Sequence, residues 1–158
     1  MGKTRNWWGV LTDYSHLNPA FLAATSGLIC GEGCLTFSHQ RGNASTPRLA
    51  VILHRSDADC LKEIHRQLGG NYYEGKTRPS AVWVMMGIGR VLSTLYIILP
   101  YARLLKSAKV ADMEVMQEYC EWRISQPRTW GRSTPMPPEV VTRKQEFVQL
   151  LKSVKVRG

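Results

Sequence analysis

One succession of sequence patterns occurs twice between residues 18 and 99 and limits the folds that this chain can adopt. In each copy, a segment with helical spacing of its apolar residues is followed by two strand-like segments with a turn between them. Two strands joined by a turn predict an antiparallel hairpin. Two hairpins that alternate with helices favour an α+β fold, with one four-stranded antiparallel sheet covered by helices on one face.

The first copy begins at Asn18 and Pro19, which suit the N-cap and the first position of a helix. The helix is expected to end near Gly33. Beyond it, Leu35 and Phe37 alternate with polar residues, which predicts a half-buried strand. A second strand is expected at about residues 48–54, after a loop at 41–47.

The second copy has a helix that starts at Ser56 or Asp57 and ends at Leu68. A hairpin over about residues 71–87 follows, and then a helix from about residue 90 that Pro100 is expected to end. Further on, the pattern predicts a helix at 108–123, a basic linker at 125–138 and an amphipathic helix at 139–154. We interpret residues 1–158 as a single domain with its core at 18–123.

The charge of the chain favours a polyanionic partner. Lys and Arg number 21 against 12 Asp and Glu, which gives a net charge of +9. The charge does not distinguish DNA, RNA and anionic lipid. The four cysteines lack the spacing of a disulfide framework, and the chain begins without a secretory signal, so we expect an intracellular protein that is not secreted. Residues 81–105 are apolar, but Arg90 and Pro100 interrupt them, and we predict no membrane span.

The segment TSGLICGEG, Thr25 to Gly33, resembles the motif of the LAGLIDADG homing endonucleases. Thr25 and Ser26 stand where the family usually has Leu and Ala, and Cys30 stands at the position of its first Asp. The order of helices and strands resembles the αββαββα core of that family, whose sheet is saddle-shaped. The resemblance implies a homing endonuclease, a class of proteins encoded in organelle, bacterial and archaeal introns. The compartment therefore stays open between cytoplasm or nucleoid and organelle.

In single-motif members of this family, two copies of the motif helix pack together in a homodimer. The resemblance therefore implies a dimer interface through the small residues of the motif helix, namely Ala23, Ser26, Gly27 and Cys30. It also implies that Glu32 binds a divalent metal ion, together with the Gly31 carbonyl. Two carboxylates at two negative helix ends repel each other unless a cation neutralises them. We expect Mg²⁺, or Mn²⁺, to support cleavage and Ca²⁺ to support binding alone.

The resemblance implies two further catalytic positions near the attacking water. His54 matches a polar residue at the end of the second strand, usually Gln, with a gap of one residue. An ordinary histidine at a strand end is an equal alternative. The family's lysine corresponds either to Lys109, which we favour, or to Lys106.

Strand parity predicts which side chains face DNA, because residues i and i+2 share one face of a sheet. If Leu35 and Phe37 face the helices, the opposite face is polar and basic. The candidates for contact with double-stranded DNA are Thr36, Ser38, Gln40, Arg41, Arg48, Glu74, Lys76 and Arg78.

The leading hypothesis is a metal-dependent endonuclease that cuts both strands of a long, pseudo-palindromic DNA site and leaves 3′ overhangs. The main alternative is a maturase that binds intron RNA, or a DNA-binding protein that does not cleave. A basic protein at a membrane surface is the third interpretation, and it rests on charge alone. The roles of Trp7 and Trp8 stay open.

Overall fold

A computed structural model describes residues 10–39, 45–127 and 134–156 of the chain. Its elements follow each other in the order α1 (Pro19–Glu32), β1 (Gly33–His39), β2 (Ser45–His54), the short 3₁₀ helix η1 (Arg55–Asp57), α2 (Ala58–Leu68), β3 (Asn71–Glu74), β4 (Ser80–Met86), α3 (Ile88–Leu104), α4 (Val110–Ser125) and α5 (Pro138–Val156).

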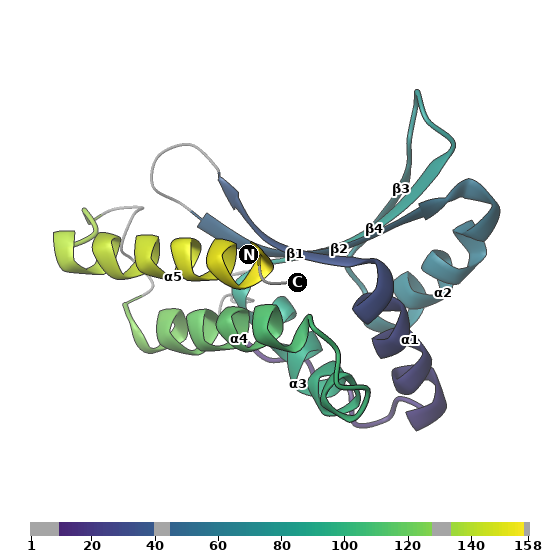
Figure 1. The fold of residues 1–158 in the computed structure, drawn as a ribbon, viewed down its shortest axis with the longest axis horizontal. Coiled ribbons are helices and arrows are strands. Elements are labelled where there is room, and N and C mark those ends of the chain that lie inside the picture. The colour runs from purple at the N-terminus through teal and green to yellow at the C-terminus, as the bar shows by residue number, and fades with distance from the viewer. Residues whose placement is uncertain (1–9, 40–44, 128–133, 157–158) are drawn as a thin grey trace, which may run out of the picture.

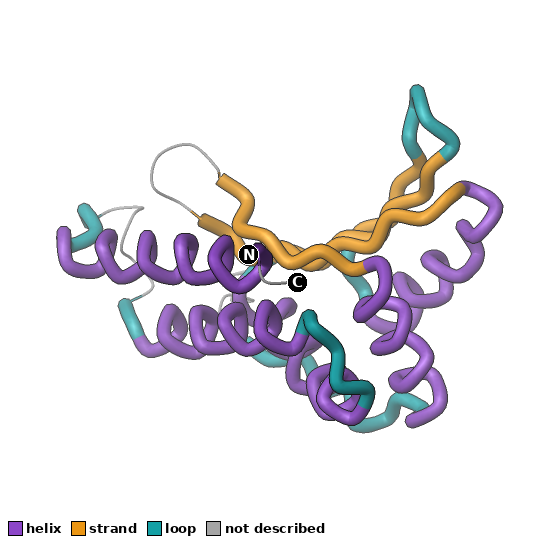
Figure 2. Tube along the Cα trace, viewed as in Figure 1, coloured by secondary structure: helices purple, strands orange, loops and turns teal. Residues whose placement is uncertain are grey.

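The four strands form one antiparallel sheet in the order β1-β2-β4-β3 (Figure 1). The helices lie along one face of the sheet, and the uncovered face is concave, because both ends of the sheet bend away from the helices (Figure 2). This arrangement confirms the predicted α+β fold with a saddle-shaped sheet.

The main core lies between the sheet and the helices. Every second residue of each long strand points into it, as Leu35 and Phe37 do from β1 and as Trp83 and Met85 do from β4. The same core includes Phe147 and Leu151 of α5, so the C-terminal helix packs on the sheet and helices rather than standing apart. Because Leu35 and Phe37 face the helices, the predicted orientation of β1 is confirmed.

Local hydrogen bonds account for the start of α1. The Asn18 side chain accepts the backbone N–H of Ala20 at 2.7 Å, and Pro19 occupies the first turn. This N-cap is the one that the sequence predicts.

Two predicted boundaries were wrong. The α3 helix continues through Pro100 to Leu104, because the residues around the proline, Leu99 and Ala102 among them, are buried and their packing outweighs one lost backbone hydrogen bond. Strand β2 begins at residue 45, inside the expected loop. The start of α2 is confirmed, because Asp57 occupies its N-cap position, although the Asp57 side chain makes no capping bond and the side chain of His54 caps η1 just before it.

Residues 81–105 form β4 and α3, as predicted. No helix within the described ranges combines the length and the hydrophobicity that a membrane span needs.

Candidate active site and nucleic-acid interface

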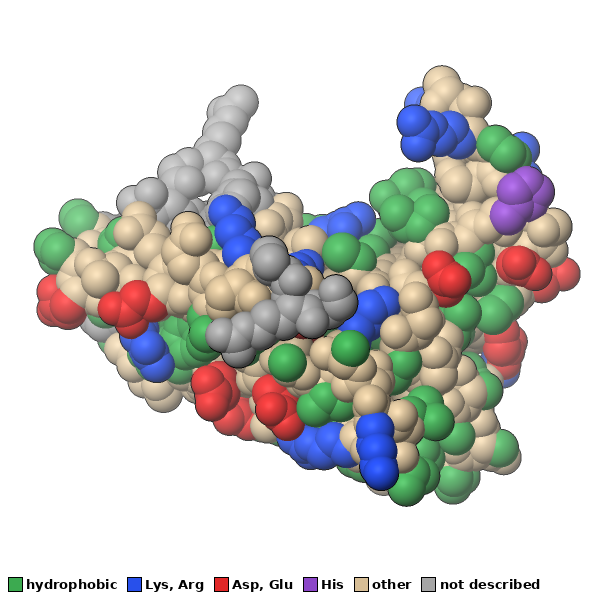
Figure 3. Space-filling view, in the orientation of Figure 1, with side chains coloured by type: hydrophobic (Ala, Val, Ile, Leu, Met, Phe, Trp, Pro, Cys, Tyr) green, Lys and Arg blue, Asp and Glu red, His purple; other side chains and the backbone are tan. Residues whose placement is uncertain are grey.

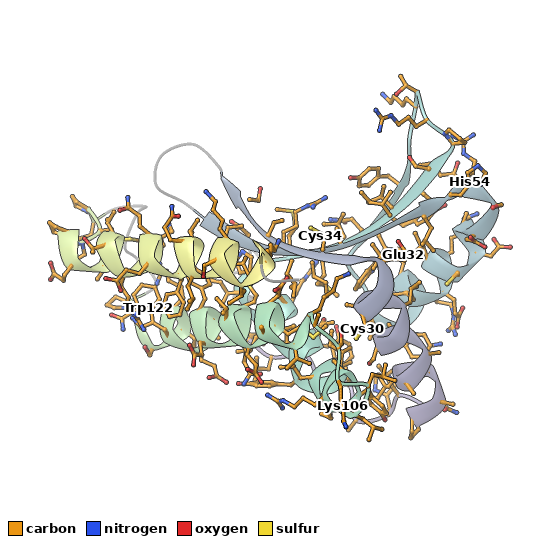
Figure 4. The ribbon with its side chains drawn as sticks, viewed as in Figure 1. Cys30, Glu32, Cys34, His54, Lys106 and Trp122 are labelled. Carbon is orange, nitrogen blue, oxygen red and sulfur yellow. The ribbon has the colours of Figure 1, made fainter. Side chains whose placement is uncertain are left out.

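The motif helix ends at an exposed carboxylate. Glu32 is the last residue of α1, and the N–H of the next residue, Gly33, donates to the carbonyl of Ile29. A Cβ at Gly33 would lie 2.5 Å from that carbonyl oxygen, so the chain can pass directly from α1 into β1 only with glycine here. The result is an acid held at the point where the helix meets the sheet (Figure 4).

Lys109 reaches the same helix end from the turn before α4. Its Nζ donates to the carbonyl of Ile29 at 3.4 Å, although the two residues are 80 positions apart in the sequence. A cation is favourable here, because the last carbonyls of a helix carry partial negative charge. Lys106 is exposed in the turn after α3, with φ at 54°, and Figure 4 shows it far from Glu32. Of the two candidate lysines, Lys109 is therefore the one that contacts the last turn of α1, which Glu32 ends.

Two further charged residues join this region, and the sequence analysis did not select either of them. Lys155 of α5 donates to the carbonyl of Leu35 in β1, and its Nζ lies 4.0 Å from the Cys34 sulfur. Asp112 of α4 is buried, which raises the pKa of its carboxyl, while the nearby charges of Lys155 and Lys109 oppose that rise. The spacing from Lys109 to Asp112 could have indicated a shared helix face. Lys155 gave no signal, because its position depends on how α5 docks.

The structure does not bring His54 to the Glu32 end of the motif helix. Its ring Nδ1 lies 3.1 Å from the Ser56 nitrogen, and accepts that backbone N–H as a helix cap. In Figure 4 the labelled His54 lies near the top of α2, well away from Glu32. In the register of the sheet Gly33 lies opposite Val51, so His54 lies three residues further along β2, and its role near the attacking water stays a prediction.

The α1 helix presents two different faces. Thr25, Ser26 and Ile29 are buried within the protomer, and the Ser26 hydroxyl donates to the Leu22 carbonyl at 2.6 Å. The placement of Ser26 in a dimer interface is therefore corrected, because this side chain is fully covered by its own chain. Cys30 is half-buried and packs against the main core.

The outer face of α1 consists of small residues. Ala23 is exposed, and a Cβ added at Gly27 or Gly31 would meet nothing within 4 Å. Among the residues that the structure describes, no close neighbour explains these two glycines by lack of space. We call this face, formed by Ala20, Ala23, Ala24, Gly27 and Gly31, the outer face of α1.

The predicted DNA-facing residues divide into three groups. Thr36, Ser38 and Arg48 lie on the uncovered face, as expected, since Thr36 pairs with Arg48 and its neighbours Leu35 and Phe37 are in the core. Gln40 and Arg41 lie outside the described residues.

The third group is at the end of β3. Glu74 pairs with Ala81, a core-facing residue, so it lies on the helix-covered side at the sheet edge, which corrects the prediction. There it accepts a hydrogen bond from the Tyr72 hydroxyl at 3.0 Å and lies 4.0 Å from Arg55. The prediction assumed the wrong phase of the strand, because Tyr72, two residues earlier on the same face, packs against the main core. Lys76 and Arg78 are exposed in the turn that follows.

The middle of the uncovered face is not polar, contrary to expectation. Ala50, Val82 and Val84 form an apolar cluster separate from the main core, and Met86 packs against it. Basic side chains flank hydrophobic ones in the hollow of the sheet (Figure 3).

The Glu32 end of α1 has donors that suit a hard divalent cation. It combines an exposed carboxylate with the last-turn carbonyls, which have no partner within a helix. In the described parts of the chain, no group of three His, Cys, Asp or Glu side chains could hold a metal ion. One protomer thus supplies a single carboxylate and a few carbonyl oxygens at this helix end, which is fewer than the ligands that a hard divalent cation takes.

No protein-family model matches the sequence, and no curated protein matches it. Solved structures do resemble the fold. The homing endonuclease I-CvuI, in complex with the I-CreI target in the presence of Mg, aligns with a TM-score of 0.64 and 18% identity, over 85% of this chain and 80% of that chain.

Two longer proteins are also similar. The I-LtrWI LAGLIDADG homing endonuclease bound to target DNA has a TM-score of 0.62 and 17% identity, over 87% of this chain and 45% of that chain. The LAGLIDADG homing endonuclease I-GzeII in complex with its DNA target has a TM-score of 0.58 and 18% identity, over 85% of this chain and 44% of that chain. This chain thus spans less than half the length of these two. It has the fold of the LAGLIDADG homing endonucleases.

Proposed function

We propose that this chain is a divalent-metal-dependent homing endonuclease that acts as a homodimer on a long, pseudo-palindromic DNA site and leaves 3′ overhangs. The observation that carries the proposal is the meeting of Glu32 and Lys109 at one helix end, from segments far apart in the sequence. The solved structures of similar fold are described as homing endonucleases, and several are bound to DNA targets, which supports the substrate class.

The outer face of α1 supports the dimer. Small side chains let two helices approach closely, and the open space beside Gly27 and Gly31 is free for a second copy of the same helix. Two-fold contact along this face brings two Glu32 carboxylates toward each other. The longer proteins of similar fold, of which this chain matches less than half, are consistent with a chain that forms half of a working unit.

In the proposed reaction, Glu32 and the Gly31 carbonyl hold Mg²⁺ or Mn²⁺ beside the scissile phosphate. The bound cation neutralises charge and lowers the pKa of a water molecule. Lys109 donates hydrogen bonds toward the charge that develops on the phosphate oxygens, and its bond to Ile29 keeps the ammonium group in place. Lys155 and Asp112 balance the charge around Lys109.

The test is a cleavage assay on duplexes selected from a randomised library in the presence of Mg²⁺. Glu32→Gln should lose cleavage and keep specific binding, measured by gel shift in Ca²⁺, because the amide cannot supply the negative charge. Glu118→Gln, an exposed change on α4, is the matched control and should cleave normally. Cleavage by Glu32→Gln at the wild-type rate would contradict the proposal.

The two candidate lysines are compared in the same assay. Lys109→Met should cleave about 10²–10³-fold more slowly, the usual loss when one donor to developing charge is removed. Lys106→Met should cleave normally. The reverse result would transfer the role to Lys106.

A binder without cleavage is the second candidate, and Cys30, which stands at the position of the family's first Asp, favours it. Such a protein would protect duplex DNA or folded intron RNA from footprinting reagents without cutting, with or without Mg²⁺.

A further inference from the structure

An apolar row crosses three strands on the concave face of the sheet. Ile52 of β2 pairs with Val82 of β4, and Val82 pairs with Tyr73 of β3. Ile52 is 55% exposed and Tyr73 is 50% exposed, whereas Val82 between them is almost covered. Two large apolar side chains therefore project from this face on either side of a valine.

The neighbouring row continues this surface. It consists of Cys34, Ala50, Val84 and Asn71, which are successive cross-strand partners, and the two in the middle are apolar and buried. We call the surface formed by Ile52, Tyr73, Val82, Ala50 and Val84 the apolar belt. Met86 packs against its inner part.

Polar and basic groups border the belt on two sides. Thr36 and Arg48 form the next row on one side. On the other side, Lys76 and Arg78 stand exposed in the β3–β4 turn. Figure 3 shows basic side chains on both sides of hydrophobic ones in the hollow. Such a surface is complementary to a polyanion that places negative groups against the two basic ends and apolar groups against the centre.

The major groove of DNA offers such a group in the 5-methyl of thymine. The other base edges there present hydrogen-bond donors and acceptors and no methyl group, and isoleucine cannot satisfy those polar atoms. Pressing a G·C edge against the belt would leave its polar atoms without partners, which is costly. An A·T pair with its methyl group on the belt avoids much of that cost.

We propose that the apolar belt selects thymine methyl groups in each half-site, so that the segment of DNA above Ile52 and Tyr73 is read by apolar contact. This inference rests on the proposed function, because it assigns the uncovered face to duplex DNA. The polar rows beside the belt contact the flanking base pairs and phosphates of the half-site. The belt specifies the A·T base pairs between them.

The experiment starts from duplexes that the wild-type chain selects from a randomised library in Ca²⁺. Thymine should be enriched at a pair of positions related by the symmetry of the site. Each such thymine is then replaced by deoxyuridine, which pairs in the same way and lacks the methyl group. Binding should weaken about fourfold for each methyl removed, since one buried methyl-sized group corresponds to about 0.8 kcal/mol.

A variant of the belt locates the effect. Ile52→Ser should remove the preference for thymine over deoxyuridine at one position, while the general affinity for duplex DNA stays. Ile52 is largely exposed, so the change leaves the main core intact, and circular dichroism checks the fold. Leu150→Ser, at another exposed apolar residue on α5, is the matched control and should keep the preference.

The outcomes separate the two proposals. If the chain binds a specific duplex but does not distinguish thymine from deoxyuridine, the belt proposal is wrong and the proposed function stands. If no duplex is selected, the proposed function fails and the inference fails with it. If Ile52→Ser changes the oligomeric state of the protein in the absence of DNA, the belt is a contact between protein chains. The inference is then overturned.

Discussion

At the residue scale, Gly33 and Gly31 flank the catalytic candidate and differ in what surrounds them. The backbone of Gly33, with φ at −73°, suits any residue, so its requirement is for space beside Ile29. Gly31 has open space within the protomer. Two neighbouring glycines of one motif thus serve different purposes, one inside the chain and one outside it.

This difference predicts opposite effects of the same substitution. Gly33→Ala should lower the free energy of unfolding by about 1–3 kcal/mol, because the Ile29 carbonyl must move to admit the methyl group. Gly31→Ala should leave the protomer as stable as before or raise stability by up to about 1 kcal/mol, as alanine favours a helix. Chemical denaturation of both variants measures the contrast, and equal losses would contradict it.

Lys144 of α5 is a buried cation. Burial, together with the nearby charge of Arg123, lowers the pKa of its amine from 10.5 to about 8. The unfolded chain therefore binds more protons than the folded chain between these two values. The buried charge of Lys144 therefore lowers the free energy of unfolding by its full amount below pH 8. This destabilisation declines as the pH rises toward 10.5.

Lys144→Met should consequently raise the free energy of unfolding at neutral pH, by about 1–3 kcal/mol. The gain should shrink when the denaturation is repeated at about pH 9.5. Lys152→Met, an exposed change on the same helix, is the control and should show no such dependence. A gain for Lys144→Met that is the same at both pH values would be evidence against a charge effect.

The candidate site could be predicted only where it depends on local sequence. Glu32 and the preference for Lys109 follow from the resemblance to the family motif, whereas the contact of Lys109 with the end of α1 depends on how the turn before α4 is placed. Lys155 had no local signal at all. The capping of η1 by the His54 ring was not predicted either, because it depends on how the chain turns after β2.

At the scale of elements, α3 contains a proline that its packing tolerates. Pro100 is exposed, while Ile98, Leu99 and Ala102 around it are buried. A proline inside a helix has no N–H to donate and its ring crowds the preceding turn. The helix therefore continues at a cost that the core contacts offset.

Pro100→Ala should raise the free energy of unfolding by about 1–2 kcal/mol, because a backbone bond is restored and only part of that gain is lost to the greater freedom of the unfolded chain. Urea denaturation measures the change. Pro135→Ala, in the exposed segment before α5, is the control and should not stabilise. A destabilised Pro100→Ala would mean that the ring itself contributes to packing.

Elements with a strong local pattern could be predicted, and those decided by packing could not. Alternation placed Leu35 and Phe37 in the core, and the cap at Asn18 placed the start of α1. The continuation past Pro100 depends on contacts with other elements. So does the burial of Ser26, because helical spacing alone does not say which face of α1 meets α3.

At the scale of the whole molecule, the outer face of α1 separates folding from assembly. Gly27→Leu should leave the protomer folded, since nothing lies within 4 Å of a Cβ there. It should block close approach of a second helix, so that sedimentation gives the mass of one chain, and cleavage should be lost. Gln145→Leu, an exposed helical position on α5, should stay dimeric. A dimeric Gly27→Leu would show that assembly uses another surface.

The two faces of α1 have an engineering consequence. The buried face, with Ser26 and Ile29, must remain compatible with α3, whereas in the proposed dimer the outer face must remain compatible only with a copy of itself. A bulky residue at Gly27 in one copy and compensating truncations of Ala23 and Ala24 in another would therefore pair unlike chains in preference to like ones. Such obligate heterodimers would recognise asymmetric DNA targets, in which each half-site is bound by a different chain.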